Sequence, residues 1–246
     1  MRLVRTFVFL LAFSSLGAAQ SLTNCTSANT TGASTITTVA FGTVTVNDAI
    51  VVFTSGIGAS STATITDNSG SGLSWVQVGS YYYSTDRGGM FVVKAITSAY
   101  SGATITSTWT FGGQATIVAC EISGAITGTG LVDTSTGSAA NGVTSMTSPS
   151  FTTSNANDLL VYCTGNPSSG MGTAAAGLIG SVTATIPTGA TGSNRSACEY
   201  VLATSIQTGI TAAMSWANST THQIAIAGAF EVNLASANKT MMPVVY

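Results

Sequence analysis

The stretch that decides the fold is Asn47-Asp48-Ala49-Ile50-Val51-Val52-Phe53, and a second version of it stands at Asn157-Asp158-Leu159-Leu160-Val161-Tyr162-Cys163. In each version a polar Asn-Asp pair precedes five apolar residues. Asn and Asp favour turns because their side chains hydrogen-bond to the nearby backbone. A short apolar run after such a turn is typical of a β-strand. The two stretches therefore predict two equivalent core strands, 110 residues apart.

Further matching residues extend this repeat over most of the chain. At offsets of 107 to 110 they are Thr97-Ser98 and Thr204-Ser205, Gly102 and Gly209, Ile105 and Ala212, Trp109 and Trp216, and Glu121 and Glu231. A half of this size forms a small sheet whose apolar face needs a partner, and two halves stacked face to face bury both faces. We therefore expect an all-β fold, a single jelly-roll-like β-sandwich built from two pseudo-repeated halves.

The rest of the chain fits an all-β fold, because Thr, Ser, Val, Ile and Gly dominate it and the helix formers Glu and Lys are scarce. Gly, Ser and Asn clusters divide it into short runs. The expected strands lie near 36–45, 49–55, 61–67, 74–83, 89–96, 103–110, 115–122, 149–153, 158–164, 178–186, 197–204, 210–217 and 223–232. The expected segments are a signal peptide (1–19), a Ser/Thr/Asn-rich segment (20–35), a first half (36–126), a Gly/Ser/Thr-rich connection (127–148), a second half (149–235) and a C-terminal tail (236–246).

The N-terminus predicts secretion. Arg2 and Arg5 precede a short apolar stretch at 6–16, and Gly17-Ala18-Ala19 supplies small residues for cleavage. The apolar stretch is shorter than the roughly 20 residues of a membrane-spanning helix. We therefore expect a secreted or cell-surface protein that has no membrane insertion once the signal is removed.

The charge content excludes nucleic acid as a partner. Only 6% of the 246 residues are charged, with six Lys and Arg against eight Asp and Glu, whereas an ordinary soluble domain has about 25%. A protein that binds nucleic acid electrostatically needs a basic patch along the phosphate backbone. This sequence has too few cations to build one.

Four cysteines, Cys25, Cys120, Cys163 and Cys198, are the disulfide candidates. An even number in an oxidising compartment allows two disulfides with three possible connectivities, and the sequence leaves the pairing open. No Cys-x-x-Cys pair occurs, so we expect no zinc site.

Candidate catalytic and metal-binding groups are few. His222, the only histidine, lies in a polar stretch and is expected to be a solvated loop residue. Asp48 and Asp158 are expected in turns, and Glu121 and Glu231 as hydrogen-bonding groups at strand ends. Asp67-Asn68-Ser69-Gly70 has one charged ligand where calcium needs six to eight oxygens, so we interpret it as a hairpin turn. We therefore predict no catalytic residue, no metal and no cofactor.

Aromatic residues give the clearest indication of a binding site. Tyr81, Tyr82 and Tyr83 follow Trp75, and Asp86 and Arg87 come just after them. Flat aromatic rings beside hydrogen-bonding groups suit sugars, whose apolar C–H faces lie on the ring while the hydroxyls find polar partners. Because side chains alternate along a strand, at least one of the tyrosines should face solvent. We take these six residues as the candidate ligand-binding site.

One more pattern suggests a relationship. Its elements are Thr64-Ile65-Thr66-Asp67-Asn68-Ser69-Gly70 before Trp75-Val76-Gln77-Val78, then Phe91-Val92-Val93-Lys94-Ala95, the stretch from Gly102 to Trp109, and Glu121-Ile122-Ser123-Gly124-Ala125. This order resembles that of bacterial and phage-associated extracellular jelly-roll modules. The resemblance implies a scaffold with a surface, adhesion or glycan-contacting role. The second half lacks the Asp-x-x-Gly hairpin, so a ligand surface built on that hairpin should exist once.

Taken together, the sequence predicts a secreted, non-catalytic protein that binds an extracellular glycan or surface polymer in an adhesion-type role. A first alternative is a structural protein that forms homo-oligomers in a coat, matrix or appendage, because the strands carry few of the charges that protect sheet edges. A second alternative is an extracellular hydrolase that uses Glu121 or Glu231 with another carboxylate.

Overall fold

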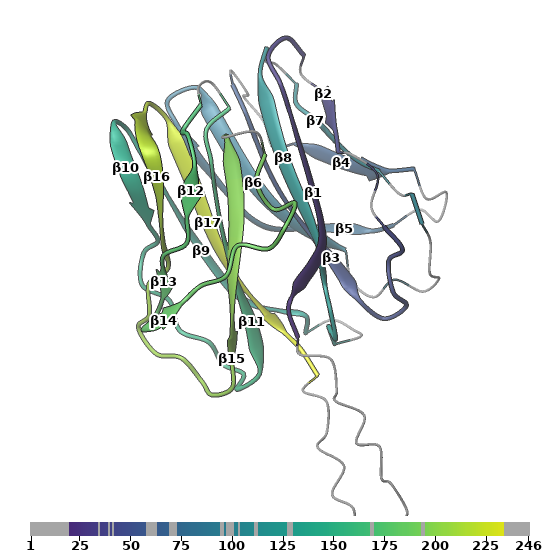
Figure 1. The fold of residues 1–246 in the computed structure, drawn as a ribbon. Coiled ribbons are helices and arrows are strands. Elements are labelled where there is room, and N and C mark those ends of the chain that lie inside the picture. Colours follow the sequence, from purple (N-terminus) through teal and green to yellow (C-terminus); the bar gives the residue numbers. More distant parts are fainter. Residues whose placement is uncertain are drawn as a thin grey trace, which may run out of the picture.

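A computed structural model of the chain describes residues 20–33, 35–38, 40, 42–57, 63–68, 73–93, 96, 101–102, 104–110, 113–126, 130–167, 170–192 and 195–233. Within these ranges all the regular secondary structure consists of β-strands. The all-β sandwich expected from the sequence is therefore confirmed (Figure 1). The predicted signal peptide (1–19) and C-terminal tail (236–246) lie outside the described residues.

The first half of the chain forms two antiparallel sheets. The larger has the order β1 (Leu22–Thr30), β8 (Ala115–Ile122), β3 (Ala49–Gly56), β6 (Asp86–Val93) and β5 (Trp75–Tyr83). The smaller has the order β2 (Thr35–Thr37), β7 (Ile105–Thr108) and β4 (Thr64–Asp67).

The second half also forms a larger and a smaller sheet. The larger has the order β15 (Ser196–Ala203), β11 (Asp158–Gly165), β17 (Gln223–Glu231) and β9 (Val132–Ala140). The smaller has the order β10 (Val143–Thr147), β16 (Ala213–Thr220) and β12 (Ala174–Ala175). A short hairpin of β13 (Leu178–Ile179) and β14 (Val182–Thr183) stands beside them.

The two halves have matching strand orders. The order β1-β8-β3-β6 in the first corresponds to β9-β17-β11-β15 in the second, and β2-β7-β4 corresponds to β10-β16-β12. In both halves the strand that begins at an Asn-Asp pair, β3 or β11, lies between two neighbours in the larger sheet. This is the arrangement that a duplicated chain would give, and the duplication itself stays a prediction.

The central strands are apolar on both faces because each larger sheet lies between two cores. In β3, Val51 and Phe53 point into a central core, whereas Ile50 and Val52 point into a core shared with the first smaller sheet. Residues of β11 alternate in the same way between the central core and a core shared with the second smaller sheet. The two larger sheets thus stack face to face as expected, and each half adds an outer layer that the sequence analysis did not foresee.

Two segments contain strands that the sequence did not predict. The segment 127–148, expected as a connection, contains β9 and β10, and the segment 20–35 contains β1. These strands are rich in Ser and Thr, and most of their side chains are only half-buried or exposed. Such strands therefore lack the apolar runs on which the expectation rested.

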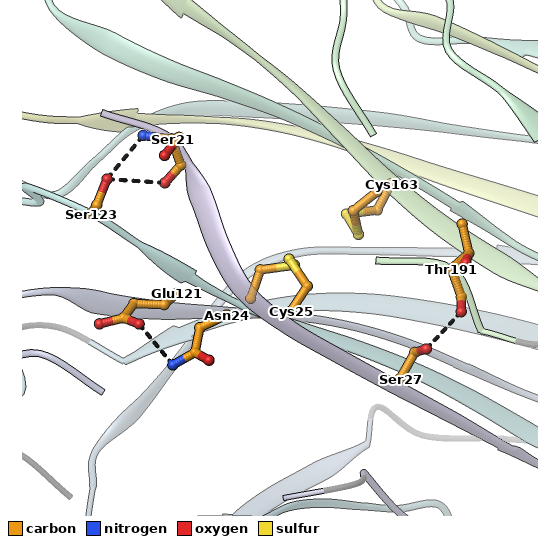
Figure 2. Close-up of a disulfide and its surroundings, with 10 residues drawn as sticks. Ser21, Asn24, Cys25, Ser27, Glu121, Ser123, Cys163 and Thr191 are labelled. Carbon is orange, nitrogen blue, oxygen red and sulfur yellow. Dashed lines mark hydrogen bonds between the residues drawn. A yellow bond between two sulfur atoms is a disulfide. The ribbon is translucent and has the colours of Figure 1, made fainter. Parts of the chain in front are cut away.

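Both disulfides lie between neighbouring strands of the larger sheets and settle the pairing that the sequence left open. Cys25 in β1 is bonded to Cys120 in β8, and Cys163 in β11 to Cys198 in β15. Figure 2 shows that both bridges project into the space between the two larger sheets, where their cysteines belong to the central core. These bridges are compatible with an oxidising environment.

Candidate functional site

The β5–β6 hairpin gathers most of the residues that the sequence indicated as a site. Its strands are joined by a two-residue turn, Ser84-Thr85, in which Ser84 has a positive φ of 54°. Tyr82 stands opposite Arg87, and Tyr83 opposite Asp86. Since side chains alternate across a strand, the Tyr82 and Arg87 pair lies on one face of the hairpin, and the Tyr83 and Asp86 pair on the other.

The first face presents an exposed aromatic ring. The Tyr82 side chain is 64% exposed, the highest value among the large hydrophobic and aromatic residues described. The guanidinium carbon of Arg87 lies 5.1 Å from the centre of its ring, which is within the range of a cation–π interaction. Arg87 thereby restricts the ring and places hydrogen-bond donors beside it.

The second face joins the two halves of the molecule through a histidine. His222, in the turn between β16 and β17, places its Nδ1 3.2 Å from Oδ2 of Asp86. Its ring lies 5.2 Å from that of Tyr83, centre to centre. Burial raises the pKa of Asp86, and the neighbouring His222 partly offsets that rise. His222 is thus held by an almost fully buried carboxyl and an aromatic ring.

This role of His222 differs from the solvated loop residue that the sequence led us to expect. The side chain is 30% exposed and paired. His222 and Asp86 are 136 residues apart, so no local pattern links them. Asp86 begins β6 and His222 lies in the turn before β17, and only the stacking of the two larger sheets brings them together.

Two of the six predicted site residues lie elsewhere. Tyr81 packs against the central core, where its ring covers Gly137 of β9. Trp75, at the opposite end of β5, packs on the outer core of the first half. Tyr82, Tyr83, Asp86 and Arg87 therefore form the candidate site together with His222, and Trp75 and Tyr81 support the scaffold.

Carboxyl groups gather at the opposite end of the larger sheets. Five of the eight acidic side chains lie there, near the starts of β3 and β11: Asp48, Glu121, Asp133, Asp158 and Glu231. The described arginines, Arg87 and Arg195, lie at the other end, near Gly56 and Gly165, and His222 lies there as well. The candidate site therefore stands at the end of the sheets where the described arginines lie.

In the first half, the acidic pair is Asp48 and Glu121. Glu121 is buried and accepts hydrogen bonds from the Thr45 amide at 2.6 Å and the Asn24 side chain at 3.1 Å (Figure 2). Asp48 accepts one from the Gly124 amide at 2.8 Å. Burial, with a smaller contribution from Glu121, raises the pKa of Asp48 to about 6.

In the second half, the acidic group is Asp158 with Asp133 and Glu231. Burial of Asp158, followed by its contact with Asp133 and the charge of Glu231, raises its pKa to about 7. Asp133 is buried less, and the hydroxyl and amide of Ser154 and the amide of Asn155 lower its pKa. These hydrogen bonds to Asp133 order the turn that leads into β11. Both carboxyl oxygens of Asp158 are buried and have no hydrogen-bond partner among the described residues, so the turn role expected of Asp158 stays a prediction.

The described residues provide neither a metal-binding cluster nor a membrane-spanning helix. They contain no group of three His, Cys, Asp or Glu side chains arranged to hold a metal ion. They also contain no helix of the length and hydropathy that would cross a membrane. In the Asp67–Gly70 turn, the Asn68 side chain accepts a hydrogen bond from the Thr104 amide at 2.7 Å, and residues 69–70 lie outside the described part.

Comparisons with protein-family models, with curated proteins and with solved structures find no match to this chain.

Proposed function

We propose that the protein is an extracellular, non-catalytic binding protein whose ligand is a glycan, held at the β5–β6 hairpin. The observation that carries the proposal is the Tyr82 ring, 64% exposed and held beside Arg87 on the tip of a rigid sheet. An exposed aromatic ring offers a flat apolar surface to the C–H face of a sugar. Function commonly sits on such turns, which a rigid scaffold positions.

The neighbouring polar groups support the same ligand class. Arg87 supplies charged donors on the face of Tyr82, and His222 adds a half-exposed imidazole on the other side of the hairpin. Sugar hydroxyls need such partners once the ring has docked. Among the described residues, no Ser, Thr or Cys side chain forms a hydrogen bond with His222, so the cluster has no nucleophile–base pair of the hydrolase type.

The extracellular part of the proposal rests on the predicted signal peptide and the two disulfides. Disulfides persist in oxidising compartments and are rare in the reducing cytosol. The sequence of residues 1–19 has the basic, apolar and small-residue regions of a secretory signal. Detection of the protein in the medium or on the cell surface, with an N-terminus at residue 20, would support this assignment.

The test of the binding site is retention on insoluble polysaccharides: cellulose, chitin, xylan and peptidoglycan. For Tyr82→Ala we expect a loss of affinity of about fivefold or more, since an aromatic contact contributes on the order of 1 kcal/mol or more. The control is Val76→Ala, which removes another exposed apolar side chain from the same strand. Unchanged retention of Tyr82→Ala would refute the site, and absence of retention on every polymer would refute glycan binding.

A further inference from the structure

A pocket of about 330 Å³ opens at the end of β15, away from the candidate glycan site. Leu160, Ile179 and Val201 contribute apolar side chains to its walls, and Ser181 and Gln207 contribute polar ones. No lining residue carries a charge. The pocket therefore suits an uncharged partner.

Exposed apolar side chains surround this pocket. Leu178 is 49% exposed, Val182 52% and Ile206 56%, and each is adjacent in sequence to a lining residue. The described part of the chain has six exposed large hydrophobic residues in total, so half of them gather here. Such gatherings commonly mark an interaction site.

The pocket also exposes a free length of strand edge. On the outer edge of β15, the N–H and C=O of Tyr200 exchange hydrogen bonds with Thr185. Two residues further along, the N–H and C=O of Leu202 point to the same side. No described residue bonds to them, and Leu202 lines the pocket. An open edge of this kind accepts an additional strand.

The C-terminal part of the same chain begins close to this edge. Ala203 and Glu231 both pair with Asp158, one on each side, which puts them about 10 Å apart because neighbouring strands are spaced by about 4.8 Å. The described residues end at Asn233, two residues after Glu231. Residues 234–240 can span up to about 23 Å, which is more than the distance to Leu202.

The last residues of the sequence match the exposed apolar side chains beside the pocket. They are Met241-Met242-Pro243-Val244-Val245-Tyr246, which contain no charge. Val and Tyr favour strands, and Pro is tolerated as the first residue of an edge strand. We propose that residues 244–246 add to β15 at Leu202 as a short strand of the same chain, with their apolar side chains against Leu178, Val182 and Ile206.

Amide hydrogen exchange of the full chain and of a chain ending at Thr240 tests the proposal. In the truncated chain we expect the Leu202 amide to exchange at least about tenfold faster, because it loses its hydrogen-bond acceptor. The Tyr200 amide, bonded to Thr185, is the internal reference and should be unchanged. Equal exchange of Leu202 in both chains would overturn the proposal.

Two further measurements locate the occupant. In the full chain, Val182→Asp places a charge on the rim, and we expect it to speed exchange at Leu202 as truncation does. In a full-length chain whose residues 241–246 are replaced by Gly and Ser, the Leu202 amide should exchange as fast as in the truncated chain. This variant shows whether the protection depends on the side chains of the tail or on its length. Protection of Leu202 that grows with protein concentration would assign the strand to a second copy and overturn the intramolecular assignment.

Discussion

Glu199 is an acidic residue buried in the outer core of the second half. Its side chain is fully buried, and its Oε2 accepts a hydrogen bond from the Gly177 amide at 2.9 Å. Its Oε1 has no partner among the described residues. Burial raises the pKa of Glu199 to about 7. The carboxyl is therefore partly protonated in neutral solution and fully protonated in acidic solution.

The Glu199 carboxyl makes the stability of the second half fall as the pH rises. Its pKa is higher in the folded state than in the unfolded chain, so folding is most favoured below about pH 4.5 and loses stability as pH rises through about 7. We predict that Glu199→Gln raises the free energy of unfolding at pH 8 by about 1–3 kcal/mol and changes it little at pH 4. Urea unfolding at both pH values measures this. An equal effect of Glu199→Gln at both pH values would contradict a raised pKa for Glu199.

Gly137 is the residue on which the packing of β5 against β9 depends. A Cβ at this position would meet the ring of Tyr81, and the carbonyl oxygen of Ala225 lies 2.7 Å away. We predict that Gly137→Ala lowers the free energy of unfolding by about 1–3 kcal/mol, the usual range for overpacking. The control is Gly113→Ala, since a Cβ there meets nothing within 4 Å. Thermal or urea unfolding with no difference between the two variants would refute this packing.

Among the elements, the strand pairs that carry the disulfides offer a direct comparison. Cys25 and Cys120 are separated by 95 residues, and Cys163 and Cys198 by 35. A cross-link that closes a longer loop removes more entropy from the unfolded chain. We predict that replacing either pair by alanines costs about 2–5 kcal/mol, and that the Cys25 and Cys120 pair costs about 1 kcal/mol more. Urea unfolding of the two double variants checks the order, and a larger loss for the Cys163 and Cys198 pair would contradict it.

Sequence reasoning placed several strands within a residue, among them the fully buried β8 and β11 and the partly exposed β5. The expected ranges 115–122 and 158–164 agree with β8 and β11 within a residue, because continuous apolar runs bounded by polar turns are a local signal. The strands β1, β9 and β10 were missed, because partly exposed Ser and Thr produce no such run. The smaller sheets were missed as separate layers, because sheet membership depends on pairing between distant segments.

The candidate site was found only in part for the same reason. The hairpin residues Tyr82, Tyr83, Asp86 and Arg87 are close in sequence, and local composition was enough to indicate them. His222 reaches them only through the stacking of the two larger sheets. Tyr81 was assigned to the site although it packs on Gly137, a contact between two sheets that no local pattern records.

At the scale of the whole molecule, the carboxyls predict a protein that is more stable in acid. The pKa values of Asp48, Asp86, Asp158 and Glu199 are raised, with burial as the main cause. Folding therefore takes up protons, and stability falls as pH rises from about 5 to about 8. Asp133 has the opposite effect because its pKa is lowered, and its contribution to the stability of the folded state is lost only at lower pH. A melting temperature that is constant or rises between pH 5 and pH 8 would contradict this prediction.

The pairing of the cysteines has a consequence for biosynthesis. In chain order, Cys25 and its partner Cys120 both precede Cys163 and its partner Cys198, so the two bridges neither cross nor nest. A polypeptide that leaves the ribosome or a translocation channel from its N-terminus presents the first pair completely before the second begins. Oxidation in the order of emergence then yields the native pairing directly, without any need for an isomerase to exchange partners.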